Sequence, residues 1–197
     1  MAQRSRFIRF AAAFTREPQS TTAWATGAVG EEVVARPLTV LAERGVLALH
    51  DRRIPGRRSN IDHIVVSTAG ALVVDTKRYQ GATVRTGRVG GIFTPRRDEL
   101  LVRGRLGSKL IDGLDKQVDA VRSVLVAGGF ADVPVGRALC FVDADFPWFT
   151  RIMRVGDTCV VNPRGLLDLV TRPGPLVSDD QWYAVSCQLG ERLRSMD

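Results

Sequence analysis

The chain has 197 residues, of which 45% are hydrophobic and 25% charged, so it can bury a real core and is not a disordered chain. No apolar run is long enough to cross a bilayer, and we expect no membrane-spanning segment and no membrane partner. The formal net charge of +7 favours a polyanionic partner such as nucleic acid, although charge alone would also suit ribosomal contacts or anionic lipid.

Residues 1–22 combine a basic, apolar start with a polar stretch that contains proline. The apolar part is short and lacks a small-residue cleavage site, so we expect a surface or pairing helix over residues 4–15 instead of a signal peptide. Residues 17–22 have the composition of a linker. A protein-interaction role for the N-terminal segment remains open, as does the oligomeric state, including a homodimer.

Residues 24–44 predict a helix, because apolar residues recur at helical spacing and Gly45 suits a C-terminal stop. Pro37 falls inside this helix and predicts a kink or a break. Glu31 shares the apolar face, which would direct its carboxylate inward, toward a partner. The alternative is that Glu31 only favours the N-terminal end of the helix electrostatically, and spacing alone does not decide between the two.

Residues 46–54 predict the first strand, and an arginine-rich turn around Pro55-Gly56 follows it. Arginine binds phosphate oxygens in a bidentate way, so a loop leading into a catalytic site would be a sensible place to hold a nucleic-acid backbone. For any single side chain, a solvated basic loop is the stronger interpretation. The candidate backbone contacts are Arg52, Arg53, Arg57, Arg58 and, further along the chain, Arg78.

Two short apolar runs, residues 61–67 and 71–74, predict adjacent strands of a hairpin, since they are rich in Val and Ile and too short for helices. Apolar residues occupy both faces of each run, which predicts central strands covered on both sides. Because strand side chains alternate, Asp75 and Lys77 must share one face.

Asp62 joins that face only if the connection between the two strands has even length. A two-residue turn at Ala69-Gly70 would place Asp62 opposite Lys77, whereas a four-residue connection would place it directly opposite Asp75. A three-residue connection would turn Asp62 to the other face.

The even-length case gathers two carboxylates and one ammonium at one end of a buried sheet, where the carboxylates need a proton or a cation. Oxygen ligands of this kind suit Mg²⁺ or Mn²⁺, which retain water and accept phosphate oxygens. A lysine beside such a metal can polarise a phosphate or activate the attacking water, which is the chemistry of phosphodiester hydrolysis. The competing interpretation is that Asp62 caps the strand entrance while Asp75 and Lys77 form an ordinary ion pair.

The rest of the chain predicts further strands and helices. Strands are expected at residues 82–89, 99–103, 135–142 and 158–161, a helix at 108–127, and two helices, to about 170 and 194, that begin after the capping residues Asn162 and Ser178. Few aromatic residues lie near the predicted site, so we expect recognition of the nucleic-acid backbone more than of the bases.

Gln117 is the one polar member of the apolar stripe along the predicted helix 108–127. A buried amide needs hydrogen-bond partners, so Gln117 either supports a site or is a satisfied core amide.

Motifs of several other enzyme classes are missing from the sequence, including a G-x-S-x-G elbow, a Walker P-loop and a dinucleotide fingerprint. His50 and His63 have no metal-ligand spacing, and alternation turns His63 to the face opposite Asp62, where a packing role is expected. Three cysteines, Cys140, Cys159 and Cys187, lack zinc or disulfide spacing and predict small buried thiols in a reducing, cytoplasmic compartment.

The segments Gly30-Glu31, NIDHIVV at 60–66 and VDTKRYQG at 74–81 resemble the nuclease-related domain (NERD) family of the PD-(D/E)XK nuclease superfamily. The similarity extends from about residue 27 to about residue 142 and is most specific over the central segments. It implies metal ligation by Asp62 and Asp75, with Glu31 as an additional acidic ligand, and a catalytic role for Lys77. It also places Gln117 at the site, although the tyrosine that often follows one turn later is Val121 here.

The resemblance implies an α/β fold with a restriction-endonuclease-like core, in which helices flank a mixed central β-sheet. We expect an N-terminal segment (1–22), a nuclease core (23–172) and a C-terminal helix packed on the core (173–197). The expected activity is Mg²⁺- or Mn²⁺-dependent hydrolysis of phosphodiester bonds, in DNA over RNA. The alternative is a nucleic-acid-binding module that keeps the fold without cleaving.

Overall fold

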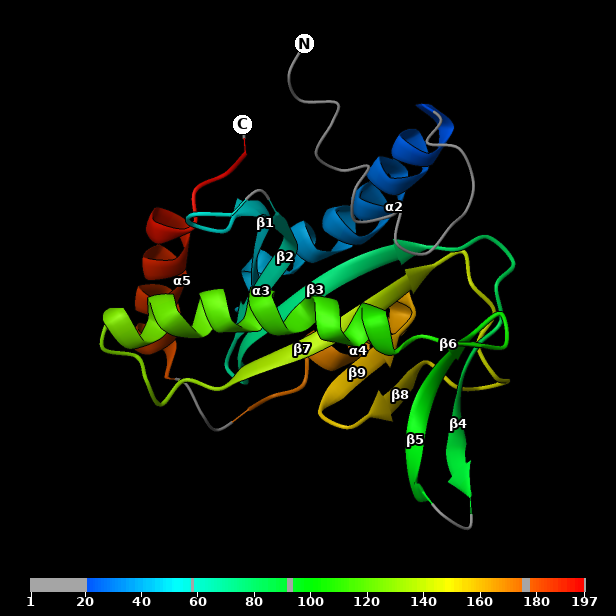
Figure 1. Ribbon diagram of the computed structural model, residues 1–197. Coiled ribbons are helices and arrows are strands. Elements are labelled where there is room, and N and C mark those ends of the chain that lie inside the picture. The colour runs from blue at the N-terminus through cyan, green and yellow to red at the C-terminus, as the bar shows by residue number, and fades with distance from the viewer. Residues whose placement is uncertain (1–20, 58, 92–93, 175–177, 197) are drawn as a thin grey trace.

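The computed structural model describes residues 21–57, 59–91, 94–174 and 178–196, so the helix expected over residues 4–15 lies outside the described part. Two sheets and four α-helices make up this part (Figure 1). The helices are α2 (Thr21–Val40), α3 (Ser108–Ala127), α4 (Pro163–Val170) and α5 (Asp179–Arg192), with a 3₁₀ turn η1 (Leu41–Arg44). The strands are β1 (Leu47–Arg53), β2 (Asn60–Ser67), β3 (Gly70–Arg78), β4 (Val84–Gly91), β5 (Thr94–Val102), β6 (Arg105–Leu106), β7 (Val135–Val142), β8 (Ile152–Val155) and β9 (Thr158–Val161).

The central sheet has six strands in the order β1-β2-β3-β7-β9-β8. The β3–β7 and β7–β9 pairs are parallel and the other neighbours antiparallel, so the sheet is mixed as expected. Strands β4, β5 and β6 form a separate small sheet that projects from the body (Figure 1). A mixed sheet flanked by helices is the restriction-endonuclease-like architecture.

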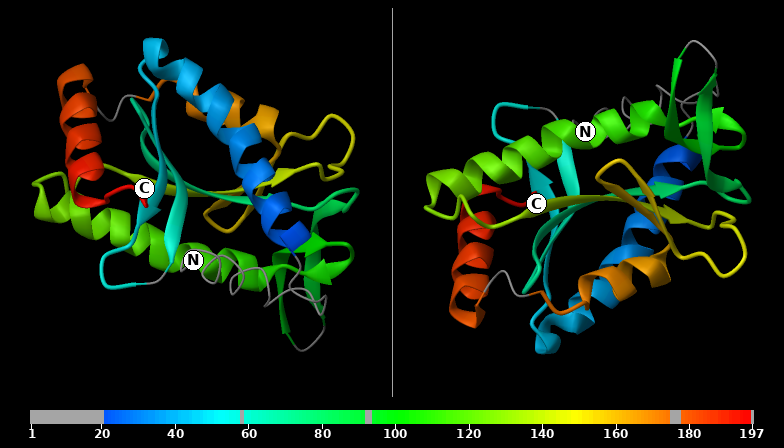
Figure 2. Two further views of the ribbon diagram at one scale, coloured as in Figure 1. Left: turned by 90° about the horizontal axis from the view of Figure 1, so that it is seen from above. Right: turned by 90° about the horizontal axis from the view of Figure 1, so that it is seen from below.

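Helices cover both faces of the central sheet and divide the core in two (Figure 2). One core includes Leu114 of α3 and Leu189 of α5 against Val73 of β3. The other includes Leu38 of α2 and Leu166 of α4. Because both faces are buried, β2 and β3 are apolar on both sides, which explains their continuous Val and Ile content.

Most elements lie where the sequence predicts them, although β5 begins at Thr94 and not at residue 99, and two short strands were missed. Helix α2 continues through Pro37 and ends in the 3₁₀ turn, and Gly45, at φ +71°, stops it as expected. Strands β6 and β8 were not predicted, because two and four residues carry too little periodicity. Helix α5 packs on the sheet, where the Trp182 indole N–H donates to the Val66 carbonyl at 3.0 Å.

Candidate active site

Strands β2 and β3 bring Asp62 and Asp75 to one face of the sheet. Their register runs from Ser67 opposite Gly70 to His63 opposite Val74, so one further step sets Asp62 across from Asp75. The predicted four-residue connection gives this same pairing of Asp62 with Asp75. The predicted two-residue turn at Ala69-Gly70, which would set Asp62 across from Lys77, is wrong. Gly70 belongs to β3, where a Cβ would lie 2.5 Å from the Pro134 carbonyl oxygen and φ is +109°, so only glycine fits.

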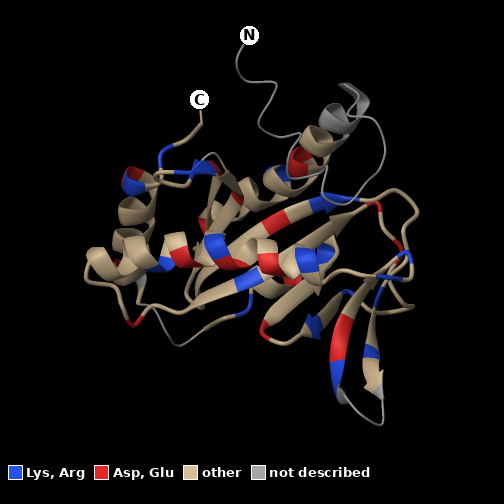
Figure 3. Ribbon diagram, in the orientation of Figure 1, with Lys and Arg blue, Asp and Glu red and all other residues tan. Residues whose placement is uncertain are grey.

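The shared face is the one that α3 covers. Val73 of β3 packs in the core beneath α3, and by alternation Asp75 and Lys77 project to the same side. The Lys77 ammonium donates to Asp75 Oδ1 at 2.8 Å. The two side chains are 19% and 5% exposed, so this ion pair is largely removed from water. Figure 3 shows acidic and basic residues following one another along β3 toward its C-terminal end.

The carboxylate oxygens of the two aspartates have different surroundings. Asp62 Oδ2 accepts the backbone N–H of Thr76 at 2.8 Å, which ties the end of β2 to β3. Asp75 Oδ2 is buried, and no hydrogen-bond donor reaches it from the described residues. A buried carboxylate oxygen without a donor is costly unless a cation or a water ligates it. Asp75 therefore has one oxygen available for a ligand.

Glu31 reaches this group from α2, on the opposite face of the sheet. The preceding residue, Gly30, allows the approach, since a Cβ there would lie only 3.0 Å from the Arg78 Cβ. Burial, the Asp51 carboxylate and, more weakly, the Asp75 carboxylate together raise the pKa of Glu31 to about 7, against the opposing effect of the Lys77 ammonium. Glu31 thus shares one electrostatic environment with the residues of β3.

The pKa of Asp62 is raised by its surroundings. Burial raises it well above its usual value, and the carboxylates of Asp75 and Glu31 add to the increase. The Lys77 ammonium and the Thr76 N–H act in the other direction. Burial also disfavours the Lys77 ammonium, but Asp75 and Asp62 more than compensate and raise the pKa of Lys77, which therefore keeps its charge. The acidic groups at this end of the sheet outnumber the one cation among them.

Asp51 is a member of the acidic group that sequence reasoning missed. His50 pairs with His63 and Arg52 with Ile61, so Asp51 stands across from Asp62 in the same row. Its φ of +47° interrupts the ladder, and the Asn60 side-chain amide donates to its carboxylate. After burial, Asp51 is the main contributor to the raised pKa of Glu31. In the sequence, Asp51 is marked only by being a single carboxylate within the predicted first strand, which is too little to assign it to a site.

Gln117 lies in the layer between α3 and the sheet and is 4% exposed. Its Oε1 is buried and receives no hydrogen bond from the described residues. It shares the buried stripe of α3 with residues that pack in the core beneath this helix, namely Leu110, Leu114, Val118, Val121 and Leu125. The layer that contains Asp75 thus holds a second oxygen without a donor.

These residues fit a divalent cation by chemistry more than by preformed geometry. Among the described residues, no three His, Cys, Asp or Glu side chains are already arranged as a metal-ligand set. The Lys77 ammonium provides positive charge at Asp75, and Thr76 holds one oxygen of Asp62. Two features favour a cation. Asp75 Oδ2 receives no hydrogen bond from the described residues, and the neighbouring carboxylates repel one another unless a positive charge lies between them. Carboxylate oxygens are the ligands that Mg²⁺ and Mn²⁺ prefer.

The candidate arginines occupy different environments. Arg52 donates to the Leu193 carbonyl at 3.4 Å, and Arg53 is exposed with its Nε near Met196 Sδ. Arg57 is exposed in the β1–β2 loop, whereas Arg58 lies outside the described residues. Arg78 pairs with Asp143 at 2.6 Å beside the C-terminal end of β3. The described candidate arginines thus differ from one another in their exposure and in their hydrogen-bond partners.

The two histidines lie on the reverse face of the sheet, as predicted for His63. The Nδ1 atoms of His50 and His63 are 2.8 Å apart, and His63 Nε2 is 3.2 Å from the Thr76 hydroxyl. Burial and the neighbouring His50 lower the pKa of His63 to about 3, so the ring is neutral. Neither imidazole lies on the face that carries Asp62 and Asp75.

Comparison with known families agrees with this geometry. The family model described as "nuclease-related domain" (NERD) matches residues 26–142, which include the α2 glutamate, the β2–β3 hairpin and helix α3. No curated protein and no solved structure matches the chain. Within the described residues, no helix combines the length and apolar character required to cross a membrane. The match covers more than half of the chain, and the protein therefore belongs to the nuclease-related domain family.

Proposed function

We propose that this protein is a divalent-metal-dependent nuclease that hydrolyses phosphodiester bonds, with DNA as the favoured substrate. The observation that carries the proposal is the pairing of Asp62 with Asp75 across β2 and β3, with the Lys77 ammonium on Asp75 Oδ1 and with Asp75 Oδ2 buried and free of a donor among the described residues. Glu31 lies within electrostatic reach of this group. Membership of the nuclease-related domain family supports the same class of reaction.

In this proposal Asp62 and Asp75 hold one Mg²⁺ or Mn²⁺, and Glu31 ligates it directly or through water. Such a cation supplies Lewis-acid activation of a phosphate oxygen and of water. The protein would contribute the fixed carboxylates, which would hold this cation in place. Because Asp62, Asp75 and Lys77 are largely buried, their charges act at a reduced dielectric constant.

Lys77 acts as a hydrogen-bond donor in this scheme. Its pKa is raised by Asp75 and Asp62, so the amine is protonated and is not the base that removes a proton from water. The ammonium orients the attacking water or binds a phosphate oxygen where negative charge develops. Gln117 supports the site through its unpaired Oε1.

DNA is compatible with the proposal because the scheme does not need a 2′-hydroxyl. Cleavage through the 2′-hydroxyl depends on a base and an acid beside the phosphate, and both histidines lie on the other face of the sheet. Water activated at the carboxylates would attack a deoxyribose phosphodiester equally well.

A second function, nucleic-acid binding without cleavage, is favoured by one observation. The Lys77 ammonium already neutralises Asp75 at 2.8 Å, and no ready-made three-ligand metal set is present among the described residues. A chain that keeps this ion pair as its resting structure would bind strands through its net charge of +7 and leave them intact.

The experiment that separates the two functions is a cleavage panel of labelled linear and circular DNA and RNA, single- and double-stranded, with Mn²⁺, Mg²⁺ or EDTA. We expect cleavage with either metal, none in EDTA, and at least a hundred-fold slower cleavage for Asp75→Asn and Lys77→Ala. Asp132→Asn, an exposed aspartate in the loop before β7, is the matched control and should cleave at the wild-type rate. Binding of the wild-type protein without cleavage of any substrate would refute the nuclease and support the binding module.

A further inference from the structure

A cavity of about 440 Å³ lies outside the acidic site, between α3, α5 and the β1–β2 loop. This volume is within the range of small-molecule sites. The floor is apolar and includes Ile54, Ala120 and Val124, of which Ile54 is 2% exposed. Three cations, Arg57, Lys116 and Arg192, lie around it.

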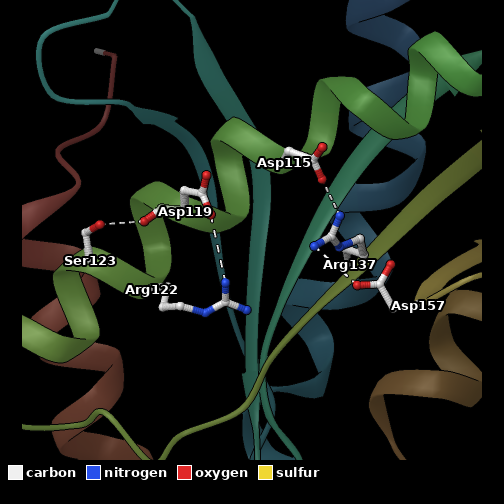
Figure 4. A network of polar contacts seen from close by, with 6 residues as sticks. All are labelled: Asp115, Asp119, Arg122, Ser123, Arg137 and Asp157. Atoms are coloured by element: carbon white, nitrogen blue, oxygen red, sulfur yellow. Dashed lines mark hydrogen bonds and ion pairs between the residues drawn. The ribbon is translucent and has the colours of Figure 1, made fainter.

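The charge of this cavity is unbalanced toward positive. No carboxylate of the described residues forms an ion pair with any of its three cations. The one acidic lining residue, Asp119, is turned toward Arg122, whose Nη1 lies 3.8 Å from Asp119 Oδ1 (Figure 4). An apolar floor with cations around it suits a ligand that has both a flat apolar part and an anionic group.

The same elements build the cavity and the acidic site. Helix α3 carries Gln117 on its buried stripe and Lys116, the preceding residue, on the cavity side. The β1–β2 loop, which carries Ile54 and Arg57, joins the strand of Asp51 to the strand of Asp62. A strand held at the acidic site can therefore continue along α3 toward the cavity.

We propose that this cavity binds one unpaired nucleotide of the substrate strand, with the base on the apolar floor and a phosphate on the cations. A paired base hides its faces in the helical stack, so only an unpaired base can enter a cavity of this kind. The inference rests on the proposed nuclease function and narrows its substrate to single strands, overhangs or frayed ends. It adds contact with one base to the recognition of the backbone that the sequence predicts, since aliphatic side chains here offer a surface to a base.

The test is fluorescence-anisotropy binding in EDTA, so that cleavage plays no part. The probes are a fluorescein-labelled oligothymidylate and the same strand in a blunt duplex with oligoadenylate. Ala120→Phe fills the cavity, and the double variant Lys116→Gln/Arg192→Gln removes two exposed charges without altering the core. Arg164→Gln, an exposed arginine on α4 across the sheet, is the matched control. Circular dichroism melting verifies that each variant is folded.

We expect Ala120→Phe to weaken single-strand binding about ten-fold and to change duplex binding less than about two-fold, as loss of one base-binding contact predicts. The double variant should also lose about ten-fold and should lower the slope of log K against log salt by roughly 0.7, because the contact to one phosphate is lost. Arg164→Gln should match the wild type. If Ala120→Phe does not fold, the double variant alone decides the outcome.

Single-strand binding unchanged in the double variant, or an equal loss for strand and duplex in Ala120→Phe, would overturn the inference. A nucleotide within a strand and a free nucleotide offer the cavity the same chemical groups. Titration with thymidine monophosphate shows which of the two the cavity binds. If Ala120→Phe abolishes mononucleotide binding but leaves strand binding intact, the cavity serves a free nucleotide and its link to the acidic site is refuted. Because these assays need no metal, their failure is distinct from failure of the cleavage panel.

Discussion

Replacement of Lys77 by methionine removes the one ammonium from the acidic group and tests whether this group is built around a cation. The Lys77–Asp75 pair, at 2.8 Å and largely buried, has a Coulomb energy of roughly 6 kcal/mol at an effective dielectric constant of about 20. Desolvation offsets part of that energy, and removing one partner of a buried pair costs about 3–5 kcal/mol because the other charge is left uncompensated. We expect Lys77→Met to lose that much unfolding free energy at neutral pH without metal.

A divalent cation should restore the stability of Lys77→Met, since it replaces the missing charge beside Asp75. At a metal concentration about one hundred times the Kd, binding to the folded state alone adds about 2.7 kcal/mol. The assay is urea unfolding followed by circular dichroism, in EDTA and in Mn²⁺. Lys109→Met, at an exposed position at the start of α3, is the matched control, and Asp75→Asn/Lys77→Met should show little response to metal. A loss below about 1 kcal/mol in Lys77→Met, or no response to Mn²⁺, would refute the reasoning.

The remaining predictions concern the surroundings of the site. The pKa of His63 is lowered to about 3 in the folded protein, so the ring stays neutral there, whereas the same imidazole in the unfolded chain binds a proton below about pH 6.5. Between these two pH values, this group alone should lower the free energy of unfolding by about 1.4 kcal/mol for each unit of acidification. His63→Gln should flatten the pH dependence between pH 6.5 and 3 by that amount in urea unfolding, and an unchanged slope would contradict a buried neutral ring. Gly27→Ala, where a Cβ meets nothing within 4 Å, should stabilise α2 by up to about 1 kcal/mol. Gly30→Ala should gain nothing and should slow cleavage, because its Cβ would press on Arg78, and equal gains at both glycines would show that the close approach is unimportant. Cys187 is the exposed cysteine and the other two are buried, so Cys187→Ser should abolish the fast phase of thiol titration with Ellman's reagent, and a remaining fast phase would contradict that burial.

The central hairpin could be predicted because its information is local. Alternation fixes Asp75 and Lys77 on one face whatever the rest of the chain does. The face on which Asp62 lies depends on the length of the connection between the two strands. The sequence shows that an even length is needed to bring Asp62 to the face of Asp75, but it does not fix that length. The structure supplies the choice, since Gly70 lies inside β3 against Pro134 and leaves Thr68 and Ala69 as the turn.

Asp51 and the cavity were beyond sequence reasoning because both depend on long-range packing. Asp51 joins the acidic row through the β1–β2 register and through α2, which carries Glu31 to within electrostatic reach. The cavity combines residues of a loop, the middle of α3 and the end of α5, and no local pattern relates these segments. Arg52 is a similar case, since its guanidinium donates to the Leu193 carbonyl near the C-terminus, a contact that no local pattern predicts.

The measurement that tests the central claim most directly is Mn²⁺ binding followed by electron paramagnetic resonance, on the wild type and on Asp75→Asn at neutral pH. It requires neither a substrate nor turnover, and it reports on the carboxylates themselves. We expect one Mn²⁺ bound per chain in the wild type and loss of that binding in Asp75→Asn. If the wild type binds no Mn²⁺, or if Asp75→Asn binds it equally well, these carboxylates are not a metal centre.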